Sequence, residues 1–265
     1  MIRRLAVGGL VSAAVGLAGW RADALSGRGA VAATVVGTGL SAGSSWRGMT
    51  VLATFFVSSS ALSRRGHGDV VAAKGSRRDE RQVLANGGVA TLAALVTATA
   101  SPATTLTLVG GSLAAATSDT WATELGAGSS RAPRLMLSGH AVAPGTSGGV
   151  TQRGSLASLA GALAIGVVTG ALVAIDNGWR RGVRSGIGVT VAGVAGSLTD
   201  SILGERVQER RRCPECDLAT EAQVHTCGAT TVVAGGVRGV DNDVVNLVCT
   251  AVGSVAAIPF VRRWD

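Results

Sequence analysis

The sequence predicts an all-α fold, a polytopic bundle of about seven or eight transmembrane helices. Three observations indicate it: 47% of the 265 residues are hydrophobic, only 15% are charged, and the mean hydropathy is +0.40. Ordinary soluble domains carry about 25% charged residues. Glycine is frequent, at 39 residues without a collagen-like period. This excess favours close helix packing inside a membrane, where bundles depend on small residues.

Eight apolar windows follow one another along the chain and are the candidate spans. They cover residues 5–19, 30–43, 48–62, 83–100, 103–117, 154–175, 185–203 and 244–261. Several are shorter than the ~20 residues that a helix needs to cross a bilayer, so a re-entrant segment remains an alternative. All five tryptophans lie at window ends, where amphipathic rings prefer the membrane interface. We expect one integral membrane domain over residues 1–265, with the lipid bilayer as its partner.

The net charge of +8 is distributed in short basic clusters that flank the windows. This pattern is typical of a membrane topology signal and not of a nucleic-acid surface, so no nucleic-acid partner is expected. The basic loop 64–81 is expected to be cytoplasmic, and alternation of spans places loops 118–153 and 204–243 on the same side. Eight spans would place Arg3, Arg4 and the arginines of 180–184 outside the cell, which the positive-inside tendency disfavours. An alternative is therefore that one early segment does not cross the membrane.

The start of the chain has two interpretations. Residues 1–24 begin with two arginines and an apolar stretch and end on Ala-Asp-Ala, which resembles the cleavage site of a signal peptide. The many apolar segments that follow favour a retained first helix in a multi-pass protein of the cell membrane.

The segment 118–126, SDTWATELG, places Asp119 and Glu124 directly after an apolar window, with hydroxyls between them. If the helix continues, Asp119 and Thr123 share one face, and Thr120 and Glu124 share another. The alternative for this segment alone is a solvated helix end with a capping aspartate.

Two further acidic segments lie at or inside apolar windows. The segment 196–204 places Asp200 within a window, and an ionisable group at membrane depth is a candidate for function. The segment 241–246, DNDVVN, opens the last window with two carboxylates and two carboxamides, of which Asn242 and Asn246 share a helical face. Helix capping accounts for one of these four groups and not for all of them.

Two loop segments carry groups that suit phosphate. The run 74–79 supplies one lysine and two arginines next to a hydroxyl, although plain cytoplasmic anchoring explains the run in isolation. The turn 144–149, PGTSGG, has glycines that allow exposed backbone amides and hydroxyls that can donate to an anion. It is not a Walker motif, and a flexible turn is the alternative.

The polar loop 204–242 contains Cys213 and Cys216 as a CxxC pair, followed by His225 and Cys227. These residue types suit a small tetrahedral zinc knuckle. The distance between the two pairs is short and the second pair is not CxxC, so a reduced pair without metal and a disulfide remain alternatives. Cys249, inside the last window, is expected to be a small buried apolar residue.

Six ordered motifs resemble those of one family of integral membrane proteins. They are RRDERQVLANGG (77–88), SDTWATELG (118–126), PGTSGGV (144–150), GSLTDSILG (196–204), CPEC (213–216) and DNDVVN (241–246). Over nearly its whole length the chain resembles the DUF92 or transmembrane protein 19-like family, which includes a plant chloroplast phytyl-phosphate kinase. That enzyme converts a prenyl monophosphate to the diphosphate. The polar stretch 151–153 departs from the apolar helix start that the resemblance implies, which affects the span boundary.

Acidic clusters, a glycine-rich turn and a basic run on one side of the membrane have the composition of a Mg²⁺-phosphate site. With the resemblance, this favours a transferase that phosphorylates an isoprenoid monophosphate, such as phytyl or geranylgeranyl phosphate, from ATP or CTP. Phosphoryl transfer depends on positioning and charge neutralisation, and a phosphate nucleophile needs no separate base.

Each group of candidate residues has an expected role. We expect five acidic residues to coordinate Mg²⁺ and place the nucleotide: Asp119, Glu124, Asp200, Asp241 and Asp243. Asp119 and Asp200 are the first candidates for the metal. Phosphate binding is expected of Lys74, Arg77, Arg78, Asn86, Thr146, Ser147, Gly148 and Gly149. Contacts to substrate or nucleotide are expected of Thr120, Ser201, Asn242 and Asn246.

Two other classes of function remain as alternatives. In a membrane transporter or lipid carrier, Asp200 and the carboxamides of the last window would form an ion or substrate path. Such a path has ionisable groups near the midplane, whereas most of the groups here cluster at span ends. A structural subunit whose zinc knuckle docks a partner would leave the acidic clusters unexplained.

Overall fold

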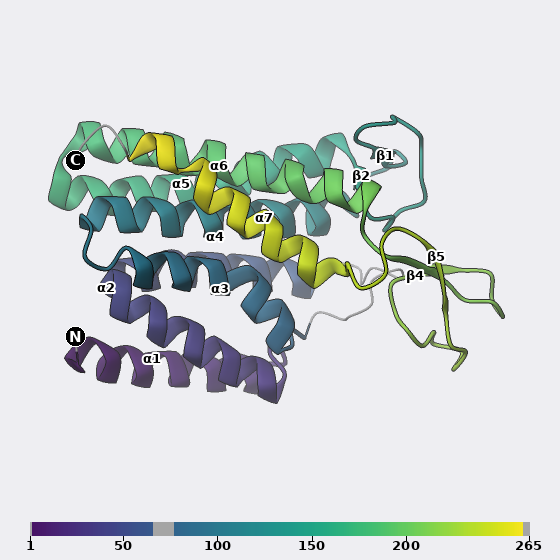
Figure 1. The fold of residues 1–265 in the computed structure, drawn as a ribbon, viewed down its shortest axis with the longest axis horizontal. Coiled ribbons are helices and arrows are strands. Elements are labelled where there is room, and N and C mark those ends of the chain that lie inside the picture. Colours follow the sequence, from purple (N-terminus) through teal and green to yellow (C-terminus); the bar gives the residue numbers. More distant parts are fainter. Residues whose placement is uncertain (1, 66–76, 262–265) are drawn as a thin grey trace.

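The computed structural model describes residues 2–65 and 77–261. They form a bundle of long helices that run back and forth along one axis (Figure 1), so the chain is mostly helical, as predicted. The helices are α1 (Ile2–Arg21), α2 (Gly27–Arg65), α3 (Glu80–Val96), α4 (Pro102–Gly126), α5 (Gln152–Asn177), α6 (Trp179–Arg206), α7 (Asn242–Ala256) and the short 3-10 helix η1 (Ile258–Phe260).

Two small sheets lie in the loops at one end of the bundle (Figure 1). Strands β1 (Arg134–Leu135) and β2 (Gly149–Val150) pair antiparallel, and β3 (Arg210–Arg212) lies between β4 (Ala219–Thr220) and β5 (Val232–Gly235). The all-α prediction does not include these strands. Segments of two to four residues are too short to show the alternating pattern by which a strand is recognised.

The long element α2 contains two helical halves. Ser45 adopts a left-handed conformation (φ 59°), and Met49 beyond it lies next to Gly37 before it. A straight helix of 39 residues would be ~58 Å long, yet Arg64 near its end donates to the backbone oxygen of Ala22, just before its start (2.8 Å). The chain therefore turns back at Ser45, and the two halves correspond to the predicted windows 30–43 and 48–62.

Polar side chains begin the helices next to the loops. Asp79 accepts from the backbone of Gln82 while Gln82 accepts from the backbone of Asp79, a reciprocal cap at the start of α3. Thr151 caps α5 by accepting from Gly154, so the polar stretch 151–153 is the cap and first turn of that helix. Asp241 caps α7 in the same way, which accounts for one of the four polar groups of 241–246.

Small residues let the helices approach closely. A Cβ atom added to Gly111 of α4 would lie 2.4 Å from the backbone oxygen of Gly253 in α7. Around this contact the core contains fully buried aliphatic side chains from several helices, including Val109, Ile165 and Val189. The high glycine content thus serves backbone contact between helices.

We expect Gly111→Val to destabilise the bundle by about 1–3 kcal/mol, because its methyl groups would meet backbone atoms that cannot move aside. The same substitution at Gly88 of α3 is the control, since a Cβ there meets nothing within 4 Å. Thermal unfolding in detergent measures both. Equal unfolding temperatures for the two variants would contradict the packing argument.

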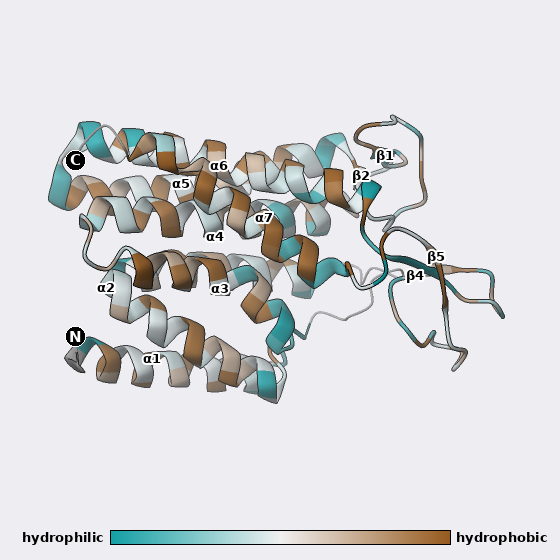
Figure 2. Cartoon of the chain, in the orientation of Figure 1, coloured by the Kyte–Doolittle hydropathy of each residue, from teal (hydrophilic) through white to brown (hydrophobic). Residues whose placement is uncertain are grey.

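The outer surface of the helices is apolar. Residues such as Leu10, Val31, Leu92, Leu156 and Ile187 are each more than half exposed. Figure 2 shows hydrophilic residues mainly at the helix ends and in the loops. Many exposed apolar side chains on long helices fit a lipid environment and would be unfavourable in water.

By length and composition, three described segments are able to cross a membrane: Gln152–Asn177, Trp179–Arg206 and Asn242–Phe260. The other helices are shorter or less apolar, in part because glycine, serine and alanine lower their hydropathy. The count of seven or eight spans stays a prediction.

Candidate functional site

Loops far apart in the sequence meet at one end of the bundle. The Ser63 hydroxyl donates to Glu124 (2.6 Å), and the Ser147 hydroxyl donates to Glu221 (2.8 Å). Because these bonds join α2 to α4 and the turn 144–149 to the segment 207–241, the described parts of the three polar loops share one end (Figure 1).

A cavity of about 630 Å³ lies at this end, between helices α4, α5, α6 and the start of α7. Most of the residues selected from the sequence are on its wall: Arg78, Asn86, Asp119, Thr120, Glu124, Thr146, Ser147, Gly148, Gly149, Asp200, Ser201, Asn242 and Asn246. These residues come from five separate segments of the chain, so the fold gathers them into one place.

Two carboxyl groups meet inside the cavity. Asp119 lies in the body of α4, which continues to Gly126, and is therefore not a helix cap. Its carboxyl group lies close enough to that of Asp200 in α6 for the two to interact. Two carboxylates this close repel each other unless a proton or a cation lies between them.

Two buried oxygen atoms of the cavity have no hydrogen-bond partner among the described residues. They are Oδ1 of Asp200 and Oδ1 of Asn246, which lie on the adjacent helices α6 and α7. A buried polar atom without a partner costs free energy, so a native structure normally satisfies it with water or an ion. Both atoms are acceptors, which a cation would satisfy.

Serine hydroxyls connect the helices beside the two carboxyl groups. The Ser118 hydroxyl donates to the Ser158 backbone oxygen (2.7 Å), and the Ser158 hydroxyl donates to that of Ser197 (3.0 Å). All three residues are buried, and they join α4, α5 and α6. This network fixes the spacing of the helices that carry Asp119 and Asp200.

Arg78 brings a cation to the cavity wall. Its guanidinium lies over the rings of Phe55 (5.5 Å) and Phe56 (6.0 Å) and donates to Ser60 (3.3 Å). Burial lowers the pKa of Arg78, while the negative charge of Glu124 opposes that shift. An arginine held by aromatic rings and facing a cavity is prepared to bind an anion.

The turn 144–149 closes one side of the cavity. Gly145 and Gly148 have positive φ angles (80° and 78°), which glycine adopts without strain. Gly148 also packs on α6 at Gly204. A Cβ atom added to Gly148 would lie 2.4 Å from the backbone nitrogen of Glu205. Two of the glycines are therefore required by the geometry of the turn itself.

The profile of the integral membrane protein family DUF92 matches residues 10–254. The chain belongs to this family. Protein PGR of Arabidopsis thaliana is 31% identical over 226 residues, which cover 75% of this chain and 76% of the relative. The uncharacterised membrane protein MJ0933 of Methanocaldococcus jannaschii is 32% identical over 208 residues, covering 76% and 82%. No solved structure matches significantly. The match confirms the resemblance to DUF92 that the sequence motifs indicated, and it confirms that the chain is an integral membrane protein.

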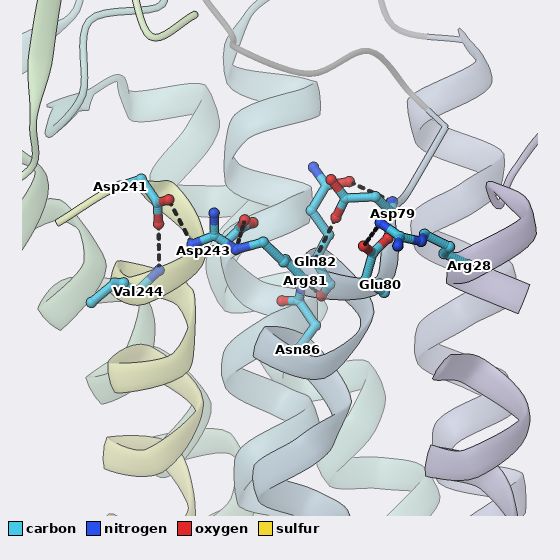
Figure 3. A network of polar contacts seen from close by, with 9 residues as sticks. All are labelled: Arg28, Asp79, Glu80, Arg81, Gln82, Asn86, Asp241, Asp243 and Val244. Atoms are coloured by element: carbon cyan, nitrogen blue, oxygen red, sulfur yellow. Dashed lines mark hydrogen bonds and ion pairs between the residues drawn. The ribbon is translucent and has the colours of Figure 1, made fainter. Parts of the chain in front are cut away.

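Three of the selected residues of this DUF92 chain lie beside the cavity and not on its wall. Asp241 and Asp243 face Arg81, at 2.8 and 3.5 Å (Figure 3). Arg77 donates to the backbone oxygen of Leu25 (3.1 Å). The catalytic and phosphate-binding roles of the three stay predictions, and Lys74 lies outside the described residues.

The cysteine and histidine residues form a separate cluster. One ligand atom from each of Cys213, Cys216, His225 and Cys227 lies within 4.8 Å of the others. A hydrogen bond with His225 is the main cause that lowers the pKa of Cys227 to about 6, and a hydrogen bond with Cys227 is the main cause that raises the pKa of Cys216 to about 11. The Cys213 and Cys227 sulfur atoms are 3.6 Å apart, too far for a disulfide.

The cavity of this DUF92 chain also uses residues that were not selected from the sequence. Glu221 accepts from both Ser147 and Gln208 (2.8 Å each) and lines the cavity together with Ser63 and Gln82. Single polar residues in polar loops carry no motif that separates them from surface residues. Ser118 and Ser197 could have been found, since they stand one and three residues before the two cavity aspartates.

Proposed function

We propose that this chain transfers a phosphoryl group from ATP or CTP to an isoprenoid monophosphate held at the membrane. The observation that supports this most is the pair of carboxyl groups, Asp119 and Asp200, in the same polar cavity as Arg78 at one end of an apolar helical bundle. Phosphoryl transfer needs that combination, because it depends on positioning phosphates and neutralising their charge.

The donor atoms of the cavity fit Mg²⁺. The carboxylates of Asp119 and Asp200 and the carboxamide oxygen of Asn246 are hard oxygen ligands, and two of these oxygens are buried without a partner among the described residues. When bound, Mg²⁺ would neutralise phosphate oxygens. The few protein ligands also match its usual coordination, in which several positions belong to water and substrate phosphates.

The remaining walls supply the rest of the binding site. Arg78 would bind phosphate oxygens, and the turn 144–149 would add hydroxyls and backbone amides. Leu159 and Leu198 line the cavity and are also about half exposed on the outer surface of α5 and α6. They offer a path by which a prenyl tail could remain in the lipid while its phosphate enters the cavity. The volume is within the range of roughly 300–1,000 Å³ that is usual for ligand sites.

The cavity end would face the cytoplasm. Arginines are concentrated there, in the segments 77–81, 131–134 and 206–212, whereas the start of α1 and the segment 180–184 lie at the other end. This asymmetry agrees with the positive-inside tendency. Trypsin should cut the 131–134 loop in inside-out vesicles and the start of α6 at 180–184 only in right-side-out vesicles, and the reverse pattern would contradict this orientation.

The activity is tested with purified protein in detergent, labelled prenyl monophosphates of several chain lengths, and ATP, CTP or GTP with Mg²⁺. We expect formation of the prenyl diphosphate with at least one pair of substrates, and loss of activity with EDTA. No product with any pair would refute the kinase. Flux of a prenyl phosphate through proteoliposomes without phosphorylation would support a lipid carrier instead.

A further inference from the structure

The segment 207–241 forms a small lobe beyond the end of the bundle (Figure 1) that has almost no apolar core. From 209 to 240, every residue is described, and the buried ones are Cys213, Thr220 and Thr231. Most of the large aliphatic side chains of the lobe are exposed, namely Leu218, Val224, Val232, Val233 and Val237. Hydrophobic burial therefore cannot hold this segment in one conformation.

Partly buried polar contacts hold the base of the lobe. Arg211 pairs with Glu209 and donates to the hydroxyl of Thr231 (2.7 Å), and Glu209 accepts from the backbone of Gly239 (2.6 Å). Both turns that project beyond these contacts are closed by backbone bonds, and the first turn has in addition only an exposed ion pair between Arg212 and Asp217 (2.7 Å). Exposed ion pairs contribute little to stability. Segments of about 40 residues or fewer normally need a disulfide or a metal to fold stably.

Each of the two turns presents two metal-binding side chains. The first is closed by a bond from the Asp217 nitrogen to the Cys213 oxygen (3.0 Å), and the second by a bond from Gly228 to His225 (2.8 Å). Asp217 and Gly228 have the positive φ angles of tight turns (57° and 89°). The turns thereby bring the four side chains together from separate positions of the loop.

The distances suit a tetrahedral zinc ion. With Zn–S bonds of about 2.3 Å, ligand sulfurs of a tetrahedral site lie roughly 3.8 Å apart. The Cys213 and Cys227 sulfurs are 3.6 Å apart, and all four ligand atoms are within 4.8 Å of one another. Three sulfurs and one imidazole nitrogen form a ligand set that is typical of structural zinc, which leaves no open coordination position.

The lobe carries two residues of the cavity wall, Gln208 at its start and Glu221. Glu221 lies in the chain between the two turns, and its carboxylate accepts from Ser147 of the turn 144–149 and from Gln208. It is also close enough to Asp200 to interact electrostatically. Whatever orders the two turns therefore also positions Glu221 relative to the cavity.

We propose that one Zn²⁺ ion bound by Cys213, Cys216, His225 and Cys227 orders this lobe and so holds Glu221 at the cavity wall. The zinc is structural and takes no part in the chemistry. This site does not depend on the reaction that the cavity performs.

Elemental analysis of protein purified without chelators tests the metal. We expect about one zinc per chain. The double variant Cys213→Ser, Cys216→Ser should lose it, while Cys249→Ala, which removes the buried thiol in α7, should retain it. Absence of zinc from the wild type, or its retention by the double variant, would overturn the site.

Limited proteolysis of the wild type tests the structural role without relying on a variant that fails to fold. Trypsin can cut the lobe at Arg210, Arg211, Arg212 and Arg238. Removal of zinc with a chelator should raise the cleavage rate there roughly tenfold or more, because the two turns would open, while cleavage at 180–184 should not change. Restoring zinc should restore protection. An unchanged cleavage rate after zinc removal would refute the role in ordering the lobe.

Discussion

Asp200→Asn is expected to lower kcat for prenyl-phosphate phosphorylation by about 10²-fold or more, with little change in the unfolding temperature. The substitution keeps the shape of the side chain and removes one charge from the pair with Asp119. A group that only stabilises the fold would show the opposite pattern, with lower stability and an unchanged rate. Asp119→Asn should behave in the same way, since both carboxyl groups face the same position.

The matched control for these two variants is Asp176→Asn. Asp176 lies at the far end of α5 from the cavity and pairs with Arg47 (2.5 Å), so this substitution also removes one helical carboxylate, but at a distance from the cavity. We expect its turnover to equal that of the wild type. Near-wild-type turnover of both cavity variants would contradict the proposed metal position. A change in substrate flux instead of turnover for Asp200→Asn would support a carrier.

Much of this site could be predicted from the sequence because membrane proteins rarely place charges in apolar segments without a function. Asp200 was recognisable as one ionisable residue inside a long apolar window, and Asp119 as a carboxylate at the end of another. Charge asymmetry between loops then indicated a common side for the segments that carry them. These signals are local, and each one can be read within about 20 residues.

The parts that the sequence did not reveal depend on contacts between distant segments. Arg81 faces Asp241 across 160 positions of the chain, and this pair keeps Asp241 beside the cavity and not on its wall. Glu221 reaches the cavity only because the lobe folds back on Ser147. Neither contact leaves a periodic pattern or a motif. The break at Ser45 falls in the gap between the predicted windows 30–43 and 48–62, although serine does not by itself indicate the left-handed conformation found there.

The aspartates selected from the sequence fall into two groups according to whether they line the cavity. Asp119 and Asp200 line the cavity in the bodies of their helices, whereas Asp241 accepts from the first turn of α7 and from Arg81. The first pair can lose a charge without losing a helix cap. For that reason the substitutions at positions 119 and 200 discriminate between chemistry and folding better than a substitution at position 241.

Arg78→Gln is expected to lower kcat/KM for the phosphoryl donor by about 10²-fold or more, because its half-buried guanidinium supplies a cation to the cavity wall. It should also reduce the free energy of unfolding by about 1–3 kcal/mol, since the carboxylate of Glu124 loses its neighbouring cation. Arg78→Lys keeps the charge but not the planar group that lies over Phe55 and Phe56, so it should recover stability and only part of the activity.

The double variant Arg78→Gln, Glu124→Gln separates the two effects of that change. Removing both charges leaves no uncompensated carboxylate, so the unfolding temperature should return toward that of the wild type. The activity should stay low, because no cation remains at that position to bind phosphate. Unfolding in detergent and the labelled-phosphate assay measure the two quantities on the same preparations. Recovery of both stability and turnover in the double variant would show that Arg78 only balances Glu124 and does not bind the substrate.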